Sequence, residues 1–344
     1  MHRSESSFRV PTTEDLLVAR RVLREFHLRT PLFYSASLSH RCGSKVHVKY
    51  ENFSYIRSFK ARGAIFCLSR LTPEEREAGV VTASTGNHGQ GVAYAGTLFG
   101  IATKIVVPDG TPDIKCDAIR ALDGELVFFG KNFREAASHA RGLAAETGAV
   151  YIDDGANYAI MAGAATIGWE IMEELPEATM LVVAVGGGNL IAGIALVAKM
   201  LKPGIRIVGV QSEAAPAVAR SWAAGHVIEC ESSTAAEGID SSSPGELAFQ
   251  VIKEKVDDMH LVSESAIRRA ILTVLHTTGQ IAEGAGAAPF AALDDLGPAW
   301  RDEKVVLVLS GGNLMPAYLH SLLNEAAESG ASPPGSPQGT VPRA

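Results

Sequence analysis

Cysteine is scarce in this chain, and its few cysteines show no functional spacing. Cys42, Cys67, Cys116 and Cys230 are the only four among 344 residues, and no two of them form a C-x-x-C pair. Zinc sites and disulfide frameworks need clustered or regularly spaced cysteines. We therefore expect neither, and interpret the four as buried or incidental thiols.

Long apolar runs and an excess of positive charge are also absent. No apolar signal segment opens the chain, and no apolar run reaches the roughly 20 residues that cross a bilayer. The formal net charge of −7 disfavours nucleic acids and anionic membranes as partners. We expect a cytoplasmic protein that binds neither.

Strand and helix signals alternate along the chain, which is typical of parallel α/β layers. With 47% apolar residues, the chain can bury a large core, and we expect two closely packed domains. Thr12 and Thr13 predict a helix start, with a buried face formed by Leu16, Leu17, Ala19, Val22 and Leu23. The predicted strands are 45–50, 80–83, 103–107, 125–129, 149–152, 180–185, 206–210, 258–262 and 304–309. Residues 327–344 are rich in Pro, Gly and Ser and are predicted to be disordered.

Lys60 lies in the run Ser58-Phe59-Lys60-Ala61-Arg62-Gly63. A desolvated lysine, or one near another cation such as Arg62, can form an imine with an aldehyde because its pKa falls. By itself this hexapeptide is more typical of an ordinary surface lysine at the start of a helix. Its significance depends on the segments downstream.

Residues 80–91 form a short strand that runs into a small polar turn before a helix. Such a turn exposes amide groups at the positive end of a helix dipole, where an anion such as a carboxylate binds. Ser84 and Thr85 add hydroxyls, and Asn87 adds an amide that can donate to a phenolic oxygen. A simple helix cap would also explain these residues.

Three glycines, Gly186, Gly187 and Gly188, separate the strand ending at Val185 from a helix at about 190–201. Bare glycine amides at a helix start predict a phosphate cradle. The segment is not a P-loop, because Ile194 and Ala195 follow Gly193 where Lys and Ser or Thr are required. Its glycines are also misspaced for a dinucleotide site.

Two further segments complete the pattern. Ser310, Gly311 and Asn313 follow the strand at 304–309, and Ser310 can hydrogen-bond a pyridine nitrogen. The small residues around Glu283 allow a backbone to lie close to a ring, although tight helix packing explains them almost as well.

Together these segments resemble the pyridoxal-phosphate family of the tryptophan synthase β-subunit, in its serine/threonine dehydratase and serine racemase branch. The resemblance extends over about 16–322 and implies a fold type II enzyme, with two open, mostly parallel twisted sheets and helices on both faces. It implies a large cofactor-binding domain (1–55 and 155–326), a small mobile domain (56–154) and a homodimer. The implied partner is a small amino-acid substrate.

The resemblance also implies roles for individual residues. Lys60 would hold pyridoxal phosphate as an imine and act as a catalytic group with Ser84 and Thr85. The other cofactor contacts would be Phe59, Asn87, Gly186, Gly187, Gly188, Asn189, Gly238, Glu283, Ser310 and Gly311. The substrate carboxylate would lie against Ser84, Thr85, Gly86, Asn87 and His88.

Several residues depart from the family pattern. Residues 55–57 replace the usual lead before the lysine, Asn189 stands where a fourth glycine is common, and Ala164 replaces a glutamine. These changes predict a remodelled pocket. Gln211 stands where metal-binding members carry a carboxylate, so we expect no metal site.

The implied reaction is the removal of water and then ammonia from a β-hydroxy amino acid. A neutral Ser310 cannot keep the pyridine nitrogen protonated as a carboxylate would, which favours expulsion of a β-substituent over a long-lived carbanion. Threonine and serine are the default substrates, and phenylserine or a hydroxyectoine-derived amino acid are open alternatives. Racemisation, β-replacement and a catalytically idle regulator or scaffold are the competing interpretations.

Overall fold

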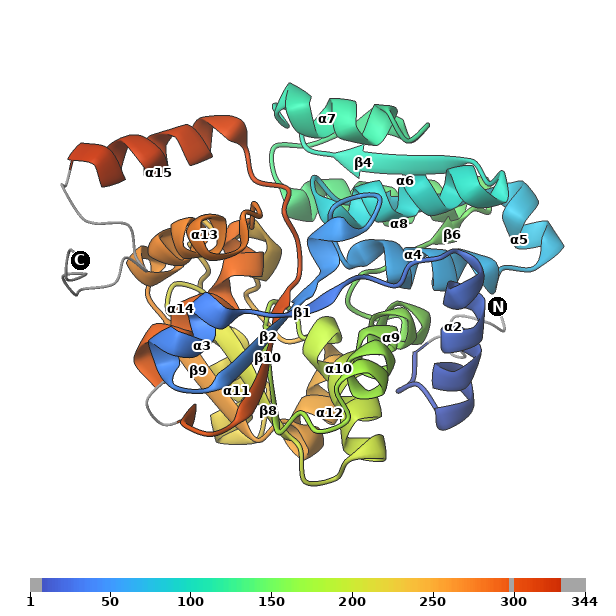
Figure 1. The fold of residues 1–344 in the computed structure, drawn as a ribbon. Helices are drawn as coiled ribbons and strands as arrows, with labels where there is room; N and C mark the ends of the chain where they lie inside the picture. The colour runs from blue at the N-terminus through green and yellow to red at the C-terminus, as the bar shows by residue number, and fades with distance from the viewer. Residues whose placement is uncertain (1–7, 297–299, 329–344) are drawn as a thin grey trace, which may run out of the picture.

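The computed structural model describes residues 8–296 and 300–328, which form two β-sheets surrounded by helices (Figure 1). The larger sheet has the strand order β1-β2-β10-β7-β8-β9, and the smaller has the order β5-β4-β3-β6. The strands are β1 Leu32–Tyr34, β2 Lys45–Tyr50, β3 Val80–Ala83, β4 Thr103–Val107, β5 Glu125–Phe128, β6 Val150–Tyr151, β7 Met180–Ala184, β8 Arg206–Ser212, β9 Asp258–Val262 and β10 Lys304–Leu309.

Helices connect almost all of these strands. The α-helices are α2 Thr13–Glu25, α3 Ala36–Cys42, α4 Lys60–Ser69, α5 Pro73–Ala78, α6 Asn87–Phe99, α7 Asp113–Arg120, α8 Phe133–Thr147, α9 Tyr158–Glu174, α10 Asn189–Leu201, α11 Ala217–Ala224, α12 Glu246–Lys255, α13 Glu264–Thr278, α14 Gly284–Leu296 and α15 Pro316–Glu328. Two short 3-10 helices are η1 Glu51–Phe53 and η2 Glu237–Ile239.

Every strand pair is parallel except β1 with β2. The predicted fold class, two mostly parallel sheets with helices on both faces, is therefore confirmed. All nine predicted strands are present within about two residues at each end. The antiparallel edge strand β1 was not predicted, because three residues directly after Pro31 give too short a pattern.

The larger sheet is covered on both faces, as a parallel sheet requires. Along β7, Val182 packs in the cluster that contains α13 and α14, while its neighbour Val183 packs in the cluster that contains α9, α10 and α12. Figure 1 shows these two groups of helices on opposite sides of the sheet. Strand side chains point alternately to the two faces, so a continuous apolar run fills both cores.

Helix α2 begins where the sequence predicts it. Thr12 is the N-cap residue, and it forms a reciprocal capping box with Asp15. Leu16, Ala19 and Leu23 are buried as predicted, but Leu17 is 44% exposed, so its predicted burial is wrong. A turn of 3.6 residues places Leu17 about 100° away from Leu16, outside the stripe that faces α9 and α4.

The two sheets coincide with the predicted domains only in part. The smaller sheet lies within 80–151, and its helices occupy the upper right of Figure 1. One apolar cluster nevertheless runs from α2 through α4 and α6 to α9, so the core is shared across the predicted boundary. The boundaries at 55, 154 and 326, and the mobility of the smaller part, remain predictions.

Other predictions concern the thiols, the carboxyl-terminal tail and the membrane. Cys42, Cys67 and Cys116 are buried and Cys230 is half-buried, all as free thiols. Helix α15 extends to Glu328, and the rest of the predicted disordered tail lies outside the described residues. Within 8–296 and 300–328, none of the helices has the length and apolarity to cross a membrane.

Candidate active site

The loops that carry the predicted site residues follow the carboxyl ends of parallel strands. Ser84 follows β3, Gly186 follows β7, Ser310 follows β10, and Asp154 follows β6. Ligands in open parallel sheets bind at this edge. The strands therefore deliver four separate segments to one region of the molecule.

Lys60 is the first residue of α4, and its ammonium lies 5.1 Å from the ring centroid of Phe59. The Phe59 amide donates to the Ser310 carbonyl oxygen at 3.0 Å, and Ser58 forms a β-bridge with Gly311. These contacts fix the start of α4 against the turn after β10. Lys60 Nζ itself donates to the carboxylate of Asp154.

Arg62 does not serve as a free cation beside Lys60, contrary to the sequence interpretation. Its side chain is 1% exposed and paired with Glu51 at 2.7 Å and with Glu170 at 2.5 Å. Lys49, which is fully buried, joins the same cluster through Glu170. With two carboxylates in contact, the positive charge of Arg62 is neutralised inside the core. The cluster instead attaches α4 to α9 and η1.

Helix α4 can approach α9 closely because glycines line their contact. A Cβ atom on Gly163 would lie 2.5 Å from the Arg62 carbonyl oxygen, and one on Gly63 would lie 2.9 Å from the Ile160 carbonyl oxygen. Backbone atoms occupy the space of a methyl group at both positions. The close crossing places Lys60 at the junction between the two sheets.

Asn87 and Glu283 meet beside the turn after β10. The Asn87 amide donates to Glu283 Oε1 at 2.8 Å, and Asn313 Nδ2 donates to Asn87 Oδ1 at 2.7 Å. Burial raises the pKa of Glu283 to about 7, even though the hydrogen bond from Asn87 opposes the shift. A Cβ atom on Gly311 would lie only 2.5 Å from Glu283 Oε1, so a larger residue there would displace the Glu283 carboxylate.

The glycine cradle after β7 is crowded at two positions and open at one. A Cβ atom on Gly186 would lie 2.9 Å from the Gly238 carbonyl oxygen, and one on Gly188, whose φ is +103°, would lie 2.6 Å from Ile252. A Cβ atom on Gly187 would have nothing closer than 3.9 Å. The open side of the cradle can therefore admit a ligand.

Two contacts connect the cradle to the rest of the site. Asn189, the first residue of α10, donates through Nδ2 to the carbonyl oxygen of Asp154, the residue whose carboxylate accepts from Lys60. A Cβ atom added to Gly238 would lie 3.4 Å from Glu283 Oε1, so these two residues are neighbours. The cradle is thus tied to both Lys60 and the Asn87–Glu283 pair.

The turn before α6 is organised by its own polar atoms. Ser84 Oγ accepts from the Gly86 amide at 3.2 Å, Thr85 lies between them, and Gly86 is the N-cap residue. The His88 side chain is 5% exposed, and its Nδ1 lies 3.3 Å from Asp154 Oδ1. Through His88 and Asp154, the amino end of α6, where an anion would be stabilised, is connected to Lys60.

These contacts close a ring around Lys60 and fit the predicted cofactor. A lysine amine, an amide and a buried hydroxyl group, together with an open glycine cradle at a helix start, match the aldehyde, ring and phosphate of pyridoxal phosphate. All predicted cofactor residues lie on this ring, which is formed by Phe59, Lys60, Asn87, Gly186, Gly187, Gly188, Asn189, Gly238, Glu283, Ser310 and Gly311. Their individual roles remain predictions.

Sequence reasoning missed Asp154 as a site residue. Its carboxylate contacts both Lys60 and His88, and no motif contains it. One signal was available, since Asp154 follows the predicted strand at 149–152 and the carboxyl end of a parallel strand points to the site. Burial raises the pKa of Asp154, but Lys60 and His88 outweigh burial and lower it to about 2.

The structure shows the surroundings of the residues that depart from the family pattern. Tyr55 is 72% exposed and stacks on Tyr94 at a centroid distance of 4.6 Å. Ala164 is buried within α9, and Gln211 is buried with its Oε1 accepting from the Ala219 amide at 2.9 Å. Within the described residues, no group of three or more His, Cys, Asp or Glu side chains could hold a metal ion. The absence of a metal site stays a prediction.

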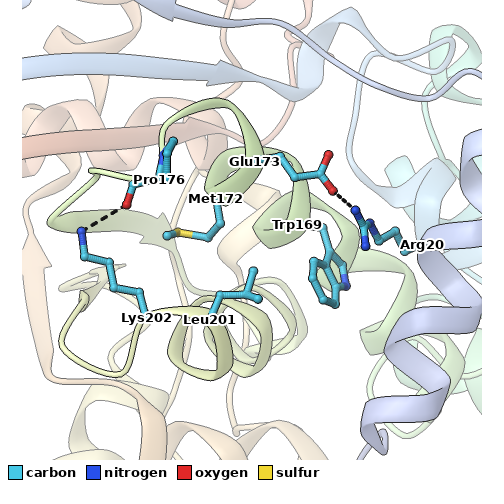
Figure 2. A pocket seen from close by; sticks show the side chains of 7 residues that line it. All are labelled: Arg20, Trp169, Met172, Glu173, Pro176, Leu201 and Lys202. Atoms are coloured by element: carbon cyan, nitrogen blue, oxygen red, sulfur yellow. Dashed lines mark hydrogen bonds and ion pairs between the residues drawn. The ribbon is translucent and has the colours of Figure 1, made fainter.

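A separate cavity of about 390 Å³ lies between α2 and the α9–α10 pair (Figure 2). Its wall is formed by Arg20, Trp169, Met172, Glu173, Pro176, Leu201 and Lys202. Figure 2 shows Arg20 turned toward Glu173, with which it forms an ion pair. None of the predicted site residues lines this cavity, so it is distinct from the site at Lys60.

Comparison with known proteins identifies the family. Residues 23–311 match the family described as pyridoxal-phosphate dependent enzymes. The L-threonine ammonia-lyase of Thermotoga maritima is 40% identical over 91% of this chain and 78% of its own length. The catabolic L-threonine dehydratase TdcB of Escherichia coli K12 is 37% identical over 88% of this chain and 92% of its own.

Solved structures agree with the sequence comparisons. The processed form of threonine deaminase isoform 2 from Solanum lycopersicum superposes with a TM-score of 0.86, at 34% identity over 92% of this chain and 95% of that one. Maize serine racemase gives a TM-score of 0.85, at 31% identity over 92% of this chain and 98% of that one. The ring of residues around Lys60 thus lies in the fold and sequence context of this family, and the chain belongs to the pyridoxal-phosphate-dependent enzymes.

Proposed function

We propose that this enzyme is a dehydratase, or ammonia-lyase, that removes water and then ammonia from a β-hydroxy amino acid to give a 2-keto acid. The observation that carries the proposal is the ring of contacts that brings Lys60, Asn87, the glycine cradle and Ser310 together. The resemblance to two enzymes named for threonine ammonia-lyase or dehydratase activity supports elimination as the type of reaction.

Each part of the site has a task in this proposal. The amides and hydroxyls of the turn Ser84–His88, at the amino end of α6, bind the substrate carboxylate. The Lys60 amine takes the proton from the substrate Cα and later releases it to solvent, while the ionised Asp154 carboxylate accepts a hydrogen bond from the lysine nitrogen. Bound pyridoxal phosphate supplies the electron sink that makes this proton acidic. The neutral hydroxyl of Ser310 would hold the ring nitrogen and would keep that sink weak, which favours elimination.

Threonine and serine are the proposed substrates. A larger β-hydroxy amino acid, such as phenylserine or a hydroxyectoine-derived one, is a narrower form of the same proposal, motivated by residues 55–57, the serines at 241–243 and Ala164. Tyr55 gives it no support, because its ring is largely exposed and stacked on Tyr94. We further propose that the enzyme is a cytoplasmic homodimer, which size-exclusion chromatography with light scattering would test.

Racemisation is the second candidate, favoured by the similarity to maize serine racemase. A racemase needs a second proton donor on the face opposite Lys60, and Thr85 occupies the position before Gly86 where that group would lie. A threonine hydroxyl is a poorer fit for this role than serine. We therefore place elimination first.

The test is the release of 2-keto acid and ammonia by the purified holoenzyme. The substrates are L-threonine, L-serine, threo- and erythro-3-hydroxyaspartate, phenylserine and a hydroxyectoine-derived amino acid, with D-serine formation followed in parallel. Lys60→Ala should abolish release, whereas Lys104→Ala, which removes a 37% exposed side chain on strand β4, should not. D-serine without keto acid would replace the proposal by racemisation. A Lys60→Ala enzyme with full activity would refute any role for this lysine.

A further inference from the structure

Two buried hydrogen-bond acceptors face each other beside Lys60. The Thr82 hydroxyl donates its only proton to the Ile152 carbonyl oxygen at 2.8 Å, so it can only accept from His88 Nε2, which is 3.1 Å away. This assigns the proton of the neutral ring to Nε2 and leaves a lone pair on Nδ1. That lone pair points at Asp154 Oδ1, at 3.3 Å.

Neither atom has a donor among the described residues. His88 Nδ1 and Asp154 Oδ1 are both buried polar atoms without a hydrogen-bond partner. Burial lowers the pKa of His88, which keeps the ring neutral, and the pKa of Asp154 near 2 keeps its carboxylate ionised. The two acceptors therefore lack a hydrogen-bond donor, and a ligand with a donor group would supply one.

The position of this pair brings it within reach of a substrate side chain. A general base lies about 3 Å from the atom whose proton it removes. The Asp154 carboxylate accepts a hydrogen bond from the same Lys60 nitrogen, so it lies within about two hydrogen-bond lengths, or ~6 Å, of the substrate Cα. Groups attached to Cβ can therefore contact it. The Asp154 side chain as a whole is 40% exposed, although its Oδ1 atom is covered.

We propose that Asp154, oriented by His88, is a specificity-determining residue that selects amino acids by the charge of their side chain. It accepts a hydrogen bond from a hydroxyl, amide or ammonium group on the substrate and rejects a side chain that ends in a carboxylate. The inference deepens the proposed function, since it requires only that an amino acid binds at Lys60. It assigns the substrate class as neutral or cationic amino acids with a donor on the side chain.

L-Asparagine and L-aspartate provide the matched probes, because they have nearly the same shape and differ by one charge. Isothermal titration calorimetry of the purified holoenzyme measures their dissociation constants without relying on turnover. A carboxylate a few ångströms from Asp154 at an effective dielectric constant of about 20 is repelled strongly. Wild-type enzyme should therefore bind L-asparagine at least ~10-fold more tightly than L-aspartate.

Asp154→Asn tests the residue with little change in shape. The new amide can donate to His88 Nδ1 while its oxygen still accepts from Lys60, so the local contacts survive. The preference for L-asparagine should fall to within about 3-fold. The control is Asp153→Asn, which removes the same charge next door, where Asp153 Oδ1 accepts from the Gly155 amide at 2.8 Å. It should keep the wild-type ratio.

The outcomes separate this inference from the proposed function. Equal binding of the two probes by wild-type enzyme overturns it, as does an unchanged ratio in Asp154→Asn. If the enzyme releases no keto acid from L-threonine but shows the predicted ratios, the dehydratase assignment fails and the role of Asp154 stands. If keto acid is released but the two probes bind equally in all variants, the dehydratase assignment stands and the role of Asp154 fails.

Discussion

Asn87 and Glu283, 196 residues apart in the sequence, are joined by a hydrogen bond of 2.8 Å from the Asn87 amide to Glu283 Oε1. Asn313 completes the group by donating to the Asn87 oxygen at 2.7 Å. The orientation of the Asn87 amide is thus fixed from both ends before any ligand binds. Such preorganisation reduces the cost of ordering the site.

Glu283→Gln should stabilise the cofactor-free protein at alkaline pH. Because its folded pKa is about 7, against roughly 4.3 in an unfolded chain, Glu283 keeps a proton in the folded state that the unfolded chain loses. Wild-type stability should fall between about pH 4 and 7 by up to ~3 kcal/mol, and the glutamine variant should lack this loss. Urea unfolding at pH 4.5 and pH 8 measures the difference. Glu125→Gln, with 63% exposure, is the control for removing a carboxylate.

The predicted phosphate cradle can be tested with two adjacent glycines. Gly188→Ala should destabilise the protein by about 1–3 kcal/mol, because φ is +103° and Ile252 occupies the space. Gly187→Ala should leave cofactor-free stability nearly unchanged, since its Cβ atom meets nothing within 3.9 Å, but should weaken cofactor binding at least tenfold. Thermal unfolding and a fluorescence titration with pyridoxal phosphate measure the two effects. Unaltered cofactor affinity in Gly187→Ala would exclude the cradle as the phosphate site.

Arg62→Met should cost about 3–5 kcal/mol of unfolding free energy. The substitution leaves Glu51 and Glu170 buried without their shared partner, which is more costly than the loss of a surface pair. Arg29→Met, which breaks a pair between a 55% exposed arginine and Glu174, should cost less than about 1 kcal/mol. Similar losses in the two variants under urea unfolding would contradict the structural role assigned to Arg62.

The same cluster predicts a loss of stability in acid. Burial raises the pKa of Glu170, but Arg62 and Lys49 outweigh burial, and the net shift is downward. A carboxyl whose folded pKa is depressed contributes stability above its unfolded value of about 4.3, and this is lost as the pH falls through the folded pKa. Glu170→Gln should therefore narrow the gap between unfolding free energies at pH 6 and pH 3.5. An unchanged gap would show that other carboxylates dominate acid unfolding.

Ser310→Ala should weaken cofactor binding without unfolding the protein. Ser310 is 3% exposed, and its contact with α4 uses its backbone carbonyl oxygen, which alanine retains. Loss of one hydroxyl contact to the ring nitrogen should weaken pyridoxal phosphate binding about 3- to 10-fold. Ser321→Ala on α15 is the control, because its hydroxyl only donates back to Tyr318. Equal cofactor affinities in wild type and Ser310→Ala would remove this contact from the site.

Much of the fold could be predicted because its signals are local. Apolar strands such as Lys304–Leu309 and glycine turns such as 186–188 occur as short continuous patterns, and their physics depends on neighbours in the sequence. Leu17 and Arg62 were misjudged because their surroundings are not local. The first faces away from α9, and the second meets carboxylates from η1 and α9.

The sequence by itself determined the α/β class, the strands, the glycine turns and the segments that carry Lys60, Asn87 and Ser310. Each depends on propensity, periodicity or spacing, which are properties of contiguous residues. Only the tertiary structure decided that Asp154 contacts Lys60 and His88, and that Glu283 is held by Asn87 in a site that raises its pKa. Charge pairing and desolvation depend on what lies within a few ångströms in space, and residues far apart in the chain supply those neighbours.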